Sequence, residues 1–159
     1  MRLGTSRTQL DSFDDVIRPL GIRGQWSVGL GTIPTAAIVG SVDRAYDFDD
    51  RFRPRKRTSR VRLRNLQRAF PDGSFPPISV YQIGNAYFVS DGHHRVALAT
   101  MLGICYLDAE IIRFRTAQPP PPRPEPRRSR GCSDRVRVRD RIRALADGLG
   151  QPYEIESWA

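Results

Sequence analysis

The sequence predicts an α+β fold, in which helices pack on a compact mixed sheet that has extended N-terminal and C-terminal appendages. Three observations predict it. Apolar runs of strand and helix type alternate within about 80 residues in the middle of the chain, and two of the strands are joined by a Gly-Asn turn. The two ends are polar and rich in glycine or proline. At 159 residues the chain has room for one domain of ordinary size plus such appendages.

Four segments are expected along the chain. Residues 1–35 are polar and glycine-rich, and we predict an N-terminal extension with a short helix around Ser12–Ile17, capped by Ser12. Residues 36–115 carry the folded domain. Residues 116–131 are rich in proline and arginine, which predicts an extended linker, and residues 132–159 form a C-terminal helical tail.

The first half of the domain predicts one strand and one helix. Residues 36–42 are a short apolar run of strand type, and the acidic and aromatic stretch after it is expected to be a loop. From Ser59 the pattern turns helical, with arginines on most faces and one apolar stripe made of Leu63, Leu66 and Phe70.

The second half of the domain predicts a hairpin, a helix and a final strand. Residues 78–83 alternate in polarity, a Gly-Asn pair makes the turn, and residues 86–89 form the returning strand. Residues 93–102 predict a helix that ends at Gly103. Residues 104–114 contain the last strand.

Positive charge is concentrated in two blocks. Residues 51–70 carry nine Lys or Arg and no acid, and residues 113–143 carry eleven Arg and three acids. Because such blocks attract polyanions, DNA or RNA contact through both blocks is one hypothesis. The predicted tail helix has an apolar face made of Val138, Ile142, Leu145 and Leu149. Such a face needs a partner surface. The helix therefore either folds back on the domain or pairs with another chain, in a homo-oligomer or in a complex with another protein.

Several protein classes are excluded by composition. No apolar run reaches the roughly 20 residues that span a membrane, and the first residues lack the apolar core of a secretory signal, so we expect a cytoplasmic protein without membrane contact. Cys105 and Cys132 lack the spacing of metal ligands, and two cysteines make no disulfide framework.

The segment most informative about function is Asp91–Arg95, with the sequence Asp-Gly-His-His-Arg. A strand ends there, Gly92 permits a tight turn, and a helix begins at the only two histidines of the chain. The free N–H groups of a first helical turn bind anions, and Arg95, His93 and His94 add side-chain donors. Asp91 would cap the helix, bind a metal ion or accept a hydroxyl proton. Adjacent histidines point about 100° apart on a helix, so no metal site is expected here.

These residues resemble the ParB/sulfiredoxin superfamily. Phe75–Tyr81 is similar to its Pro-Pro-Ile strand, Gly92–Arg95 to its phosphate-binding turn, and Arg53–Lys56 to a Gln-Pro-Arg-Lys stretch of ParB N-terminal domains. The turn is most similar to the Asp-Gly-His-Thr-Arg of ParB-like free serine kinases. The resemblance covers about residues 36–115.

The resemblance implies a nucleotide site. ATP, ADP or CTP, with Mg²⁺, would bind through its phosphates at Gly92, His93, His94 and Arg95, with further contacts from Arg53 and Arg55. The serine-kinase-like members place a carboxylate base in the loop after the first strand, where Asp47, Asp49 and Asp50 are the candidates here. Spacing does not choose among the three, and we take Asp49, with Asp91, as the candidate for a catalytic role.

The same motifs depart from two members of the superfamily. His93 stands where sulfiredoxins carry their nucleophilic cysteine, which disfavours sulfinic-acid reduction. No long helix-turn-helix region follows the domain, which disfavours centromere binding in the manner of ParB. Three hypotheses remain: a regulatory nucleotide-binding protein, a small kinase or nucleotide hydrolase that uses Asp91 and a loop carboxylate, and an accessory protein that binds nucleic acid through its arginine blocks.

Overall fold

The computed structural model describes residues 9–71 and 74–123. Its elements in chain order are β1 (Asp11–Ser12), α1 (Phe13–Leu20), β2 (Ile22–Pro34), a short 3₁₀ turn η1 (Thr35–Ala37), β3 (Ile38–Ser41), α2 (Arg57–Ala69), β4 (Ile78–Ile83), β5 (Ala86–Asp91), α3 (His93–Met101) and β6 (Tyr106–Thr116). The six strands and three α-helices of these residues confirm the expected α+β class.

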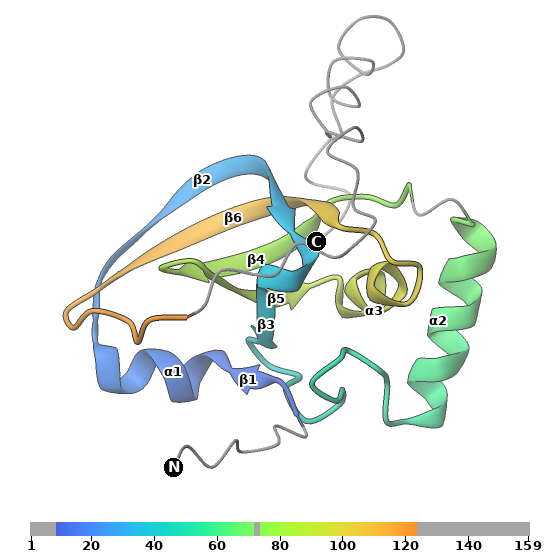
Figure 1. Cartoon of the computed structure of the whole chain (residues 1–159), viewed down its shortest axis with the longest axis horizontal. Helices are drawn as coiled ribbons and strands as arrows, with labels where there is room; N and C mark the ends of the chain where they lie inside the picture. The colour runs from blue at the N-terminus through green and yellow to red at the C-terminus, as the bar shows by residue number, and fades with distance from the viewer. Residues whose placement is uncertain (1–8, 72–73, 124–159) are drawn as a thin grey trace, which may run out of the picture.

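The strands form one mixed sheet in the order β1-β3-β5-β4-β6-β2. Neighbours β1, β3 and β5 are parallel, β5 and β4 form the expected antiparallel hairpin, β4 and β6 are parallel, and β2 runs antiparallel to β6 at the edge. Helices cover both faces (Figure 1). On one face α1 packs Phe13, Ile17 and Leu20 against the sheet, and on the other α3 contributes Val96, Ala97 and Ala99 to a larger core.

The predicted N-terminal extension is wrong for residues 11–34. These residues supply the edge strand β1, helix α1 and the 13-residue strand β2, which pairs with β6 along most of its length. The short helix was expected around Ser12–Ile17 and is found at Phe13–Leu20, and the Ser12 side chain makes no capping hydrogen bond. The domain therefore begins well before residue 36.

The start of the predicted linker also lies against the fold. Backbone amides of Ala117 and Gln118 donate to the carbonyls of Gly21 and Leu20, and Arg123 forms an ion pair with Asp11 at 2.7 Å. The remainder of the linker and the predicted tail helix of residues 132–159 lie outside the described residues.

Helix α2 stands apart from the sheet and packs on α3 (Figure 1). Ser59 is its one buried residue, and the expected apolar stripe is half-buried at Leu63 and Leu66. Its packing orients a single face of the helix toward the start of α3.

Candidate functional site

The parallel pairing of β3 with β5 positions the candidate site. Parallel strands end at the same edge of a sheet, so the loop after Ser41 and the turn after Asp91 emerge side by side. The loop then leads into α2, which packs on α3. Three segments that are far apart in sequence thus meet at the N-terminus of α3.

Gly92 makes the turn between β5 and α3. It adopts a left-handed conformation (φ 99°, ψ 26°), which favours glycine, and a Cβ there would lie 2.7 Å from Cγ2 of Ile78. The first helical hydrogen bond runs from the Val96 amide to the Gly92 carbonyl at 3.0 Å. The amides of residues 93–95 precede it and carry the partial positive charge of the helix N-terminus.

A cleft of about 270 Å³ opens at this N-terminus. The expected turn residues line it together with one apolar side chain, Leu66, and two arginines from the other segments. Arg44 comes from the loop after β3 and Arg62 from α2. Within the described residues Arg62 has no ion-pair partner, and Arg44 approaches Asp47 only at 3.9 Å. The cleft therefore combines two guanidinium groups with a helix N-terminus, and it is suited to an anion.

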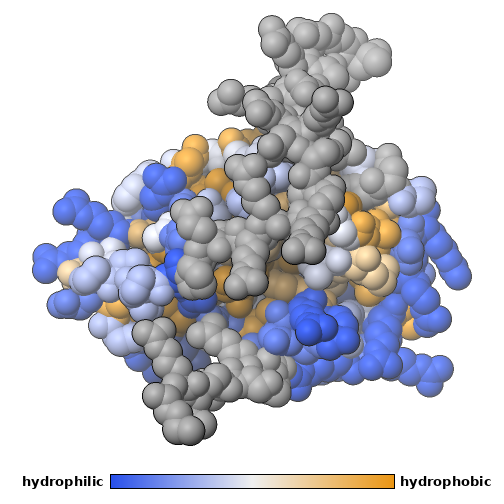
Figure 2. Space-filling view, in the orientation of Figure 1, coloured by the Kyte–Doolittle hydropathy of each residue, from blue (hydrophilic) through white to orange (hydrophobic). Residues whose placement is uncertain are grey.

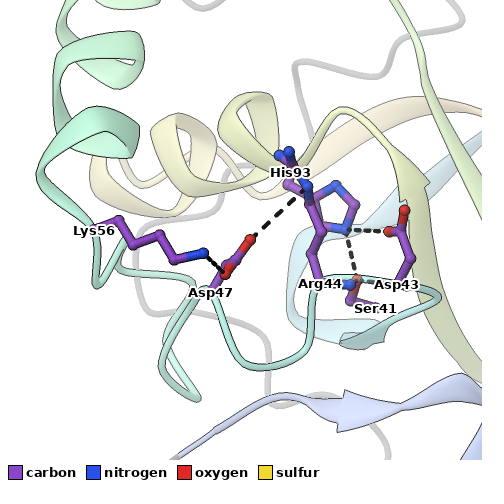
Figure 3. A network of polar contacts seen from close by, with 6 residues as sticks. All are labelled: Ser41, Asp43, Arg44, Asp47, Lys56 and His93. Atoms are coloured by element: carbon purple, nitrogen blue, oxygen red, sulfur yellow. Dashed lines mark hydrogen bonds and ion pairs between the residues drawn. The ribbon is translucent and has the colours of Figure 1, made fainter.

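His93 is a buried anchor of this arrangement (Figure 3). Its Nε2 lies 2.6 Å from the Ser41 hydroxyl, and its ring stacks on Phe48 with centroids 5.8 Å apart. The Ser41 oxygen already accepts the backbone amides of Asp43 and Arg44. Its hydroxyl hydrogen is therefore donated to His93 Nε2, which requires a neutral ring.

Burial lowers the pKa of His93 to about 4. The nearby charge of Arg44 adds to the shift, whereas Asp43, at 3.9 Å from Nε2, opposes it. The trio is not a nucleophilic triad. Ser41 and Asp43 approach the same ring nitrogen instead of opposite ones, and Ser41 is fully buried. Ser41 and His93 hold the loop against α3.

His94 lies at the cleft itself. Its Nε2 is buried without a hydrogen-bond partner among the described residues, and its ring contacts Phe48 edge-on. Burial lowers its pKa, and the charges of Arg44 and Arg62 lower it further. A buried ring nitrogen without a partner is costly, and a ligand oxygen would satisfy it.

Arg95 serves the fold more than the cleft. Its guanidinium donates to the carbonyls of Pro76 and Pro77 and pairs with Asp91 at 2.9 Å. These contacts tie the turn to the entrance of β4. The Arg95 guanidinium, which was expected to bind phosphate oxygens, therefore already has partners within the protein, although Arg95 and Asp91 both line the cleft.

The other residues selected from the sequence lie away from the cleft lining. The carboxylate of Asp49 accepts the amides of Arg51 and Arg53 and the Arg53 side chain at 2.7 Å, and these bonds lower its pKa against the effect of burial. Arg53 is held by that ion pair, and the Arg55 amide donates to the Asp47 carbonyl. Asp49 therefore stabilises its own loop, and the structure does not bring it to Asp91.

Arg44 and Arg62 are the residues that the sequence did not single out. Arg62 lies in an arginine-rich stretch where nothing local distinguishes one guanidinium from the next, and Arg44 is a lone arginine among the acidic and aromatic residues of a loop. One signal was available for Arg62: on a helical wheel it borders the apolar stripe of α2, so a packed stripe turns it toward the neighbouring helix.

Within the described residues, no group of three or more His, Cys, Asp or Glu side chains is placed to hold a metal ion. No helix in that part of the chain is long and apolar enough to cross a membrane.

No family model matches the chain, and no curated protein matches it. Among solved structures, the chain is similar to sulfiredoxin from Arabidopsis thaliana, with 18% sequence identity and a TM-score of 0.38. The match covers 52% of this chain and 82% of that chain. The similarity concerns the fold and carries no conclusion about activity.

Proposed function

We propose that the protein binds the phosphate groups of a nucleotide in the cleft at the N-terminus of α3, and that it acts as a regulatory binding protein. The observation that carries this proposal is the convergence of Arg44 and Arg62, from two separate segments, on a helix N-terminus. Guanidinium groups and free helical amides both favour phosphate oxygens. At about 270 Å³ the cleft fits a phosphate chain, so the base would lie outside it.

A binding role is preferred to phosphoryl transfer for a geometric reason. The enzyme hypothesis needs Asp91 and a loop carboxylate at one place, but Asp49 is held in its own loop, Asp47 is paired with Lys56 and Asp91 is paired with Arg95. Within the described residues, no observation favours the kinase or hydrolase alternative.

Replacing Arg62 should weaken nucleotide binding. We expect calorimetry with ATP, ADP, CTP and GTP in the presence of Mg²⁺ to detect binding of at least one of them. Arg62→Gln should then reduce affinity by about 10-fold or more, since a charge-assisted hydrogen bond contributes roughly 1.5–3 kcal/mol. Arg95 is a poorer choice because its loss also releases the turn from Pro76 and Pro77.

Arg64→Gln is the matched control, because it removes the same charge from the same helix at a residue that does not line the cleft. Its affinity should stay within about twofold of wild type. Tripolyphosphate as a competitor separates recognition of the phosphate chain from recognition of the base. Absence of binding to all four nucleotides would overturn the proposal, as would equal losses in the two variants.

Phosphate binding should also raise the pKa of His94. The two arginines now depress it, and a bound dianion would offset their charge and accept a hydrogen bond from the ring. Because the chain contains only two histidines, their NMR signals can be followed individually from pH 4 to 8, with and without inorganic phosphate or ATP. A His94 titration that is unchanged by saturating ligand would place the ligand elsewhere.

A further inference from the structure

The exposed face of α2 carries a row of arginines distinct from the cleft. Arg57, Arg60, Arg64 and Arg68 are all exposed and follow the spacing i, i+3, i+7 and i+11. At 100° per residue this spacing places them on one side of the helix, opposite the apolar stripe that packs inward. We call these four residues the arginine row. Figure 2 shows strongly hydrophilic side chains over α2, on the right of the molecule.

The arginine row destabilises the helix that carries it. Consecutive members stand three or four residues apart, where like charges repel, and none has an acid partner among the described residues. The first turn has no acid, and Lys56 and Arg57 add positive charge at the end where the helix dipole is already positive. Lys56 is paired with Asp47 at 2.8 Å, whereas Arg60 of the row donates only to the neutral carbonyl of Pro54.

We infer that the arginine row binds the phosphodiester backbone of nucleic acid without sequence preference. The row is about 16 Å long, the length over which one strand of B-DNA presents roughly five phosphates. A backbone laid along it would neutralise charges that otherwise repel one another. Arginine suits this role because its planar fork matches phosphate oxygens. The site is independent of the cleft, since Arg62 points from a different side of α2.

The test compares two triple variants of the full chain that remove equal charge. The first is Arg60→Gln, Arg64→Gln and Arg68→Gln, on the row. The second is Arg18→Gln, Arg23→Gln and Arg115→Gln, exposed positions on α1, β2 and β6. Binding of a fluorescein-labelled 20-base-pair DNA duplex is measured by anisotropy between 50 and 200 mM salt. Glutamine has a helix propensity close to that of arginine, so α2 is retained.

The row variant should bind about 10-fold or more weakly at low salt, and its slope of log affinity against log salt should be less steep by about 2 to 3. The control variant should change affinity by less than about threefold. Thermal stability of the row variant should equal or exceed that of wild type, because repulsion is removed. Equal losses in the two variants would show that only net charge matters and would overturn the inference.

Two further outcomes would also overturn the inference. If the row variant bound DNA with unchanged affinity, binding would belong to other basic residues. If the row variant lost binding to anionic lipid vesicles while its DNA binding stayed intact, the row would be assigned to membranes. Measuring nucleotide binding of the same variants distinguishes this inference from the proposed function. The row variant should retain nucleotide binding, whereas Arg62→Gln should retain most DNA affinity, so either proposal can fail alone.

Discussion

Substitution of Gly92 by alanine should cost the protein about 3 kcal/mol of stability and lower its melting temperature by roughly 10 °C. Two effects add at this position. The left-handed backbone (φ 99°) is strained for any residue with a Cβ, and the new methyl would stand 2.7 Å from Ile78 Cγ2 and 3.1 Å from Ile78 Cβ. Ile78 is buried at the start of β4, and its Cβ and Cγ2 lie close to the backbone, so relieving the contact requires a shift of the strand. Thermal or urea unfolding measures the loss.

Gly29→Ala is the matched control for this prediction. Gly29 has a similar φ of 88°, but no atom lies within 4 Å of a Cβ added there. It should therefore suffer the backbone strain alone, about 1–2 kcal/mol. If the two alanine variants lost equal stability, the contact with Ile78 would contribute nothing and the turn would be looser than described. A Gly92 variant that remains folded should also bind phosphate less well, since the first amides of α3 depend on this turn.

The parts of the fold that the sequence predicted well are those that local signals determine. The hairpin follows from alternating side chains around a Gly-Asn turn, and Gly84 indeed has a positive φ of 59°. The start of α3 can be predicted because Gly92 directly follows a buried strand and indicates a turn there. In both cases the residues that decide the conformation are adjacent in the chain.

Strand β2 was missed because its pattern depends on its partner. It contains glycines at positions 24, 29 and 31, and a bulge between Ser27 and Gly29 shifts which side chains face the core. Alternation is therefore broken, and the segment resembles a polar extension. The segment forms a strand because eleven of its residues pair with β6. This pairing joins the two ends of the domain, so it is not visible in the local sequence.

Only some of the residues that line the cleft could be identified from the sequence. Residues 91–95, which the sequence singled out, lie in the lining, but two of them have structural contacts: His93 anchors the loop and Arg95 ties the turn to β4. Asp49 shows why the loop carboxylate could not be chosen from sequence, since aspartate in a loop commonly bonds to nearby backbone amides, as it does here. Arg44 and Arg62 meet only because β3 pairs with β5 and α2 packs on α3.

Acidification should destabilise the protein through His93 well before its carboxylates are protonated. The ring is neutral when folded, with a pKa of about 4, whereas in the unfolded chain it takes up a proton near pH 6.5. Between these values the unfolded state binds more protons, so the free energy of unfolding falls as pH falls. For a side chain this buried the loss is on the order of 3 kcal/mol from pH 7 to pH 4. Urea unfolding at intervals of half a pH unit measures it.

His93→Gln tests whether this histidine is the cause. Glutamine can still accept the Ser41 hydroxyl but does not titrate, so the variant should be less stable at pH 7 and yet lose much less stability on acidification. His94→Gln should flatten the profile to a smaller degree, because its ring is less buried. Asp47 and Asp49, whose pKa values lie below 3.8, act only at lower pH. An equal slope for wild type and His93→Gln between pH 4 and 6.5 would mean that burial does not hold His93 neutral, and an NMR midpoint near 6.5 would show it directly.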